Sequence, residues 1–333
     1  MEKQIRLELL KKQLERLKTR VIKLEKLSNT YTWARLIIFT VGFVFTVLGF
    51  SIFGKTSGFL ILSLSIIFFL TAVFFHARLE ASLKKFKLVH QLKDDQINRL
   101  NLEWSKLREP LIKKTFSNHP FAYDIDIIGK NSLFQLIDNT VSEEGEELLL
   151  DWLTERNPEI ETILKRQAII KELVPLTLFR DKLLLNTYLV THNPFQKWQG
   201  KRILKWMEND NTFDELKKVL KISSILLISS YLLYIISLMG INTWLWKITY
   251  VLYAAYFFMN DQHVKAFFRE SIDIEFELRR LNSVFYKLEK FDFGKNINLQ
   301  AFCQEFKKEE TKPSLYMKRI KNLVASASVQ NNP

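Results

Sequence analysis

The sequence predicts an all-α membrane protein in which membrane helical hairpins carry coiled-coil-like cytosolic extensions around a smaller helical domain. Of the 333 residues, 47% are hydrophobic and 26% are charged, and the two kinds lie in separate stretches. The chain holds only 9 glycines and 7 prolines, which favours long helices over turn-rich β architecture. Several uncharged runs approach the roughly 20 residues that a helix needs to cross ~30 Å of hydrocarbon.

The first hairpin is expected at residues 32–77, because 36–53 and 57–75 contain no charged residue. Residues 1–30 precede it as a cytosolic amphipathic helix, and 78–114 follow it as a cytosolic stalk helix. Both carry apolar residues at alternating steps of three and four, as in a coiled coil. These positions are Leu7, Leu10, Leu14, Leu17, Val21 and Leu24, and then Leu79, Leu83, Phe86, His90, Lys93, Ile97, Leu100, Trp104 and Leu107. His90 and Lys93 interrupt the second stripe, where they fix register or face water.

The turn of this hairpin matches a phosphate-binding P-loop in spacing. Gly49, Gly54, Lys55 and Thr56 give G-x-x-x-x-G-K-T, in which glycines let backbone N–H groups surround a phosphate. That interpretation needs a strand before the motif and a carboxylate for the metal ion. Apolar membrane segments flank it instead, so we interpret the match as a coincidence and Gly54–Thr56 as a tight turn.

A second hairpin with an entry helix is expected at 213–260. Residues 222–240 are uncharged, and 244–259 form the return span, with Trp244 and Trp246 at the interface. Lys247 shortens the uncharged part of that span, so a buried soluble helix is the alternative for it. Residues 261–292 are expected to return as a lever helix, and 293–333 to form a C-terminal helical segment.

Charge predicts the orientation of these spans. The net charge is +13, and residues 1–35 carry ten Lys/Arg against four Asp/Glu. The short turns at 54–56 and 241–243 contain a single Lys or Arg between them, Lys55. By the positive-inside rule, we expect a multi-pass protein of the inner (cytoplasmic) membrane with its N-terminus and bulk in the cytoplasm.

No residue pattern indicates chemistry. The single cysteine, Cys303, is expected to be buried, and the five histidines form no metal-binding pair. The acidic run of Glu143, Glu144, Glu146 and Glu147 is interpreted as helix N-terminal charge bias on a solvated face. We therefore expect no catalytic residue, no metal site and no cofactor in this chain, which is not an enzyme by itself.

The middle segment, 115–210, is expected to form short amphipathic helices, with Thr140 and Glu143 as a capping box. Its string SLFQLIDNTVSEEGEELLLDWL, followed by Asn-Pro and ILKRQAIIKELV, resembles the core (lever) domain of MutS-type DNA mismatch repair proteins. The matching positions are Ile137, Asp138, Thr140, Gly145, Leu148, Leu149, Trp152 and Leu153.

The resemblance implies an ATP-dependent DNA-binding family, with ATP and Mg²⁺ on an ATPase domain after the core. This chain departs from the family pattern, because it lacks the mismatch-binding domain and the ATPase domain, and because membrane hairpins replace the clamp. It resembles a membrane-anchored front half of such a protein, natural or truncated.

Basic residues supply candidate contacts to nucleic-acid or lipid phosphate. They are Lys84, Lys85, Lys87, Lys113, Lys114, Lys318, Arg319 and Lys321. Those near the bilayer favour lipid over DNA.

Two functions remain open. The chain is a lever and anchor module that couples an absent ATPase domain to DNA or membrane, or it is a structural membrane scaffold whose stalks dimerise. The expected partners are the lipid bilayer, a second copy in a homodimer and, by the resemblance, DNA.

Overall fold

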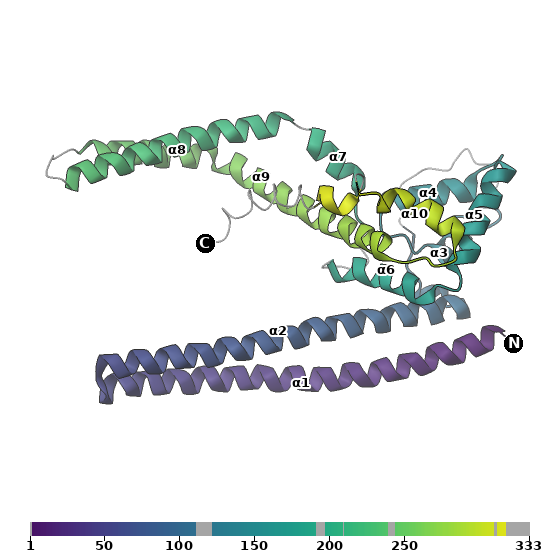
Figure 1. Cartoon of the computed structure of the whole chain (residues 1–333), viewed down its shortest axis with the longest axis horizontal. Coiled ribbons are helices and arrows are strands. Elements are labelled where there is room, and N and C mark those ends of the chain that lie inside the picture. Colours follow the sequence, from purple (N-terminus) through teal and green to yellow (C-terminus); the bar gives the residue numbers. More distant parts are fainter. Residues whose placement is uncertain are drawn as a thin grey trace. The chain divides into compact units, whose positions relative to one another are not determined.

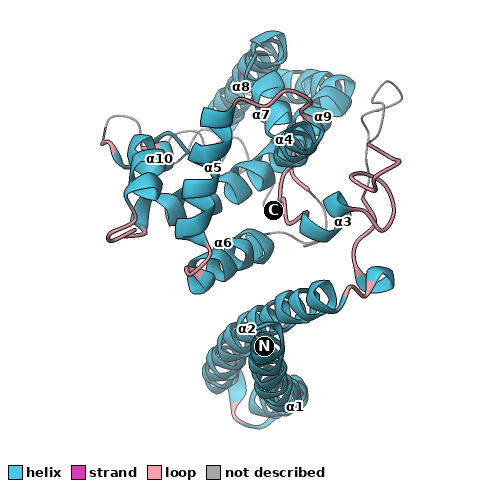
Figure 2. Cartoon of the chain, turned by 90° about the vertical axis from the view of Figure 1, so that its right-hand side faces the viewer, coloured by secondary structure: helices cyan, strands magenta, loops and turns pink. Residues whose placement is uncertain are grey.

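A computed structural model of the chain describes residues 2–110, 122–190, 197–208, 210–238, 244–309 and 312–317 (Figures 1 and 2). Within these residues the secondary structure is helical, and the only β pairing is an isolated parallel bridge between Ser142 and Trp198. The predicted all-α class is therefore confirmed. Contacts divide the chain into two compact units. Unit 1 comprises 1–139, 149–160 and 173–194, and unit 2 comprises 140–148, 161–172 and 195–333.

Unit 1 is dominated by a hairpin of α1 (Glu2–Ile52) and α2 (Gly54–Asn101), which run side by side along their length (Figure 1). Each predicted extension is continuous with its span, so the hairpin has one apolar end and one charged end. The turn needs only Phe53 and Gly54. Gly54 has φ +84°, a left-handed conformation that glycine adopts at little cost.

The predicted coiled-coil stripe forms the seam of this hairpin. Leu10 and Leu24 are buried, and the other predicted positions of α1 are half-buried between exposed neighbours. On α2, the predicted positions from Leu79 to Leu100 are likewise half-buried or buried. The period of the stripe is therefore confirmed on α1 and on α2 from Leu79 to Phe86, where the positions between are exposed. The predicted stalk helix at 78–114 is too long, because α2 ends at Asn101 and Trp104 lies in a separate 3₁₀ turn.

At the apolar end, small residues bring the two helices close together. A Cβ added to Gly42 would lie 3.0 Å from Cβ of Ser65, and one on Gly49 would lie 2.6 Å from Cδ1 of Ile61. Close approach at small residues is typical of helix pairs in membranes. The outer faces expose large apolar side chains, among them Phe39, Phe43, Phe59, Ile67 and Phe68.

Three described helices are long and apolar enough to cross a membrane: α1, α2 and residues 218–238 of α8. This supports the predicted membrane association, since length and composition both suit a bilayer.

The rest of unit 1 is a small core beside the charged end of α2. It contains the 3₁₀ turn η1 (Trp104–Lys106), α3 (Leu133–Ile137), the second half of α4 (Glu143–Thr154) and α6 (Thr177–Val190). Ala122, Ile128, Phe134 and Leu150 form its apolar centre. Residues 122–128 form turns in which Ile127 N and Ile128 N both donate to Ala122 O.

Unit 2 contains α5 (Ile160–Leu173), α7 (Gly200–Glu208), α8 (Asp210–Leu238), α9 (Leu245–Lys290) and α10 (Ile297–Lys307). The first part of α9 pairs with α8, because Ser230 Oγ donates to Trp246 O at 3.1 Å and Tyr234 packs edge-on against Trp246. Further along α9, Ile274 and Leu278 pack on Ile203 of α7. The second helical hairpin is thus present, with α9 as one helix of 46 residues.

The return span at 244–259 does not reach the apolar criterion that α8 meets, since tyrosines, tryptophans and Lys247 lower its hydropathy. Crossing by this segment stays a prediction.

Candidate functional site at the junction of α2 with the core

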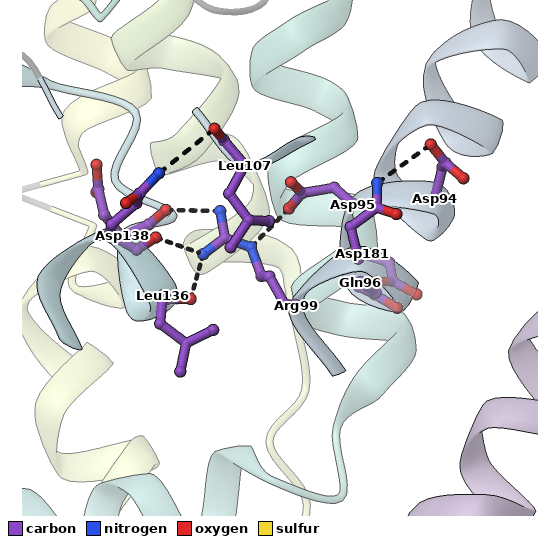
Figure 3. A network of polar contacts seen from close by, with 10 residues as sticks. Asp94, Asp95, Gln96, Arg99, Leu107, Leu136, Asp138 and Asp181 are labelled. Atoms are coloured by element: carbon purple, nitrogen blue, oxygen red, sulfur yellow. Dashed lines mark hydrogen bonds and ion pairs between the residues drawn. The ribbon is translucent and has the colours of Figure 1, made fainter. Parts of the chain in front are cut away.

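Arg99, near the C-terminus of α2, holds the end of the short helix α3. Figure 3 shows its guanidinium directed at Leu136 and Asp138. Nη2 donates to Asp138 O at 3.0 Å, and Nη1 donates to Leu136 O and, at 3.3 Å, to Gln135 O. Nε donates to Asp95 Oδ2 one turn earlier on α2, at 2.7 Å. The carbonyls at a helix C-terminus lack partners within the helix, so one cation satisfies three of them and favours the helix dipole.

The same end of α2 is tied to α6 by a second ionic contact. Lys93 Nζ lies 2.5 Å from Asp181 Oδ2, and Gln96 Nε2 donates to Asp181 Oδ1 at 2.9 Å. The Lys93 and Asp181 side chains are 13% and 22% exposed, so this pair is well shielded from solvent. Of the two expectations for Lys93, facing water is wrong, because its side chain is shielded and bound to a third helix, α6.

Helix α3 is held on its other side by its own cap. Ser132 Oγ accepts from Gln135 N at 3.2 Å, while Gln135 Oε1 accepts from Asn131 N at 2.7 Å. Both Ser132 and Gln135 are buried. Nearby, burial raises the pKa of the Tyr188 phenol, and the charge of Asp95 acts in the same direction. The junction is therefore a closed polar network with a neutral tyrosine beside it.

In unit 2 the acidic first turn of α4 binds two lysines, Lys197 and Lys201. Lys197 Nζ lies 3.0 Å from Glu146 Oε2 and donates to Thr140 Oγ1 at 2.9 Å. Lys201 N donates to Glu144 Oε1 at 2.7 Å. The prediction of a solvated acidic face is thus wrong for Glu146, whose side chain is 12% exposed. Its partner Lys197 is 51 residues away in the sequence.

The predicted capping box is also shifted. Ser142 caps α4, because its Oγ accepts from Gly145 N at 3.0 Å, whereas Thr140 bonds to Lys197. A Cβ on Gly145 would lie 3.0 Å from Ser142 Oγ, so this position favours glycine. Thr140 and Glu143 match the capping-box pattern, whereas Ser142 and Gly145 do not. In the structure Ser142 is fixed by its bridge to Trp198 and caps the helix.

Two further contacts hold unit 2 together. Glu172 at the end of α5 accepts from Asn298 N at 3.1 Å and from Leu299 N at 2.8 Å, at the start of α10. Partial burial opposes its ionisation, but these bonds and one from the Asn298 side chain outweigh it and lower the pKa of Glu172. On α9, burial raises the pKa of Glu277 against the opposing charges of Arg280 and Arg202.

The predicted site residues have different outcomes. Gly49 lies inside α1, and Lys55 and Thr56 lie in the first turn of α2. Phe53 N donates to Gly49 O at 3.1 Å, so this stretch is a helix end and not a phosphate-binding loop. The predicted turn at 54–56 is shorter than expected for the same reason.

Of the basic candidates, Lys84, Lys85 and Lys87 are exposed on α2 and lie on the charged end of the hairpin. Lys84 donates to Leu189 O at 3.4 Å, and Lys87 pairs with Glu25 at 2.7 Å. The candidates Lys113, Lys114, Lys318, Arg319 and Lys321 lie outside the described residues. Cys303 is buried, as predicted, and burial raises the pKa of its thiol.

Sequence reasoning missed Arg99. Its only local signal is the Asp95–Arg99 spacing of four, which is common on helix surfaces. Its three carbonyl partners are 36 to 39 residues away and depend on the fold.

The junction joins a helix of 48 residues, through shielded ionic contacts, to α3 and α6. Among the described residues, no group of three or more His, Cys, Asp and Glu side chains is placed to hold a metal ion. Comparison with known proteins identifies no relative: no protein-family profile, no curated protein and no solved structure matches this chain.

Proposed function

We propose that the chain is a membrane-anchored coupling module, in which stiff helices transmit displacement between a bilayer and a helical core. The observation that carries this proposal is the continuity of α2. It runs unbroken from exposed apolar residues such as Phe59 and Phe68 to the Arg99 clamp. At 1.5 Å per residue it spans ~72 Å. Because α1 is packed along it, a displacement at one end reaches the other.

The MutS resemblance gives this module a context. We propose a MutS-like core and lever whose outer ends enter lipid, working with an ATPase domain of the DNA mismatch repair type that binds ATP and Mg²⁺. Support comes from three positions of the matching string. Asp138 O accepts from Arg99, Thr140 Oγ1 accepts from Lys197, and Gly145 sits where a Cβ would press on Ser142. These residues have specific structural tasks in both units.

Our proposal includes a fourth membrane span at 244–259. Val251, Phe258 and Met259 are highly exposed there, at 63%, 75% and 80%, and such a face is costly in water. Four spans return the chain to its starting side. With Lys and Arg concentrated on the charged ends, that side is the cytoplasm and the bilayer is the inner membrane.

Anchoring is tested by mixing the full chain with liposomes, washing them at alkaline pH and floating them on a density gradient. The protein should rise with the lipid. Topology is tested in vesicles on a Cys303→Ser background, where Lys55→Cys and Lys12→Cys should react with an impermeant maleimide from opposite sides. Protein that stays dissolved and monodisperse without detergent, or labelling of both positions from one side, would contradict anchoring by this hairpin.

A structural scaffold is the second candidate, and one observation favours it. Ile5, Leu9 and Leu27 are 45–57% exposed on the charged end of α1, outside the seam, and are available to a second copy. The scaffold predicts a homodimer that Leu9→Glu converts to monomer, measured by mass in detergent.

DNA coupling is tested separately. Fluorescence anisotropy of a labelled duplex with the full chain in nanodiscs should show binding that weakens steeply with salt. Absence of binding at low salt would contradict the DNA part of the proposal.

A further inference from the structure

A polar cluster interrupts the α1–α2 seam where the apolar end of the hairpin meets the charged end. His76 of α2 is 3% exposed. Its Nε2 lies 3.1 Å from Ser28 Oγ and 3.5 Å from Oε1 of the exposed Glu80. Its ring stacks on Tyr31 of α1 with centroids 6.2 Å apart and planes 7° apart. A buried imidazole thus occupies the seam at the edge of the uncharged segments.

Two nitrogens of this region are buried and lack a hydrogen-bond partner. One is Nδ1 of His76, and the other is Nε of Arg35, one helical turn beyond Tyr31 on α1. Buried polar atoms in native proteins are almost always paired, so each unpaired atom points to a group that is missing from its surroundings. Both atoms lie near the boundary between the uncharged and the charged part of the hairpin, about one helical turn apart along it.

The directions of the two helices incline these two side chains toward the same level of the hairpin. Side chains in helices lean toward the helix N-terminus. The N-terminus of α1 lies at the charged end, so Arg35 leans out of the apolar segment. The N-terminus of α2 lies at the apolar end, so His76 leans into it. Exposed Trp33, Phe74 and Phe75 surround this level with apolar surface. A tryptophan there is typical of the lipid headgroup region.

We propose that Arg35 and His76 bind the phosphate of a phospholipid headgroup at the hairpin boundary. This inference rests on the proposed membrane insertion of α1 and α2. The phosphate oxygens accept from the Arg35 guanidinium and from Nδ1–H of His76, while Ser28 Oγ is the hydrogen-bond partner of Nε2 on the other side of the ring. A bound phosphate gives both orphaned nitrogens a charge-assisted hydrogen bond. It also fixes how deeply the hairpin sits in the bilayer.

The test uses the full chain purified in a detergent with a sugar headgroup, which supplies no phosphate. Three probes are compared at equal concentrations: dioctanoyl phosphatidylglycerol, dioctanoylglycerol and inorganic phosphate. Thermal stability reports binding to the folded state. Native mass spectrometry counts lipids on the folded population alone. Phosphatidylglycerol should stabilise the protein and remain bound. Dioctanoylglycerol, which lacks the phosphate, and inorganic phosphate, which lacks the acyl chains, should do neither.

Arg35→Gln should weaken the phospholipid by about tenfold or more, as expected for loss of a charge-assisted hydrogen bond. Arg78→Gln is the matched control, because it removes the same charge from an exposed position of α2 near the same level. Arg35→Lys, which keeps the charge, should recover part of the affinity. If a glutamine variant were unstable, mass spectrometry of its folded fraction would still give the result.

Equal lipid binding by Arg35→Gln and Arg78→Gln would overturn the site. Equal binding of dioctanoylglycerol would show that the acyl chains alone are recognised, and equal binding of free phosphate would show a soluble anion site; both also refute it. Flotation separates this outcome from the parent proposal. If the protein floats with the liposomes but Arg35→Gln still binds the phospholipid, the headgroup site alone is refuted. If the protein fails to float, anchoring is refuted.

Discussion

Replacing Arg99 by alanine should loosen the core from the long hairpin. The variant leaves the carbonyls of Leu136 and Asp138 without their charged donor, in a place where the Arg99 side chain is only 16% exposed. Two hydrogen bonds to a charged group contribute about 1.5 kcal/mol each at the low end of their range. The third, to Gln135 O at 3.3 Å, is long and adds little. The ion pair with Asp95 adds about 0.3–0.5 kcal/mol.

The sum predicts a loss of roughly 3 kcal/mol, which lowers the apparent Tm by about 6–12 °C for a unit of this size. Thermal unfolding in detergent measures the shift, and hydrogen exchange of residues 132–139 shows whether α3 opens first. Lys106→Ala is the control, because its ion pair with Glu103 is exposed and should cost almost nothing. If both variants unfolded at the same temperature, or if exchange at α3 did not change, the clamp would not hold the core.

Three further outcomes follow from single contacts. Gly58→Ala should separate α1 from α2 at the apolar end of the hairpin and cost about 1–3 kcal/mol, since the new Cβ would lie 2.4 Å from Cδ1 of Phe50. Cysteine cross-linking between α1 and α2 measures the separation, and unchanged yields would contradict this prediction. Ser142→Ala should cost about 1 kcal/mol through the lost cap of α4, read by thermal unfolding. Glu172 has a lowered pKa, so its bonds to α10 should persist above its ordinary value of 4.5 and be lost as pH falls through the lowered one. Hydrogen exchange of Leu299 against pH measures this, and Glu172→Gln should abolish the dependence.

The long hairpin could be predicted from the sequence because its information is local. Apolar length gives the span, and the alternation of three and four gives the seam, so Leu10 and Leu24 were placed correctly. The cap of α4 and the burial of Glu146 could not be predicted from the sequence. They depend on Trp198 and Lys197, which are more than 50 residues away. Local patterns report propensity, and a distant partner decides between competing local choices.

His90 and Lys93 show what an interruption of such a pattern means. A coiled-coil stripe that turns polar can be a local weakness, a device for register, or a change of partner. Here Leu88 is still buried before the interruption, and Ile97 is buried after it. Between them, Lys93 bonds to Asp181 of α6. The stripe therefore becomes polar where α2 contacts α6, and six residues later Arg99 binds the C-terminal carbonyls of another helix, α3.

This arrangement explains why polar residues are tolerated in the seam between α1 and α2. A shielded ion pair is weak evidence for stability, but breaking one partner is costly, so it specifies one arrangement over slipped ones. A slip of α2 by one turn would leave Lys93, Asp181 and Arg99 all unpaired, whereas a slip along leucines alone would cost little. Lys93 and Arg99 thus fix the position of α2 relative to α6 and α3. Asp181→Ala should then allow such slippage, and spin labels on α2 and α6 should report a broadened distance distribution. An unchanged, narrow distribution would show that apolar packing alone sets the register.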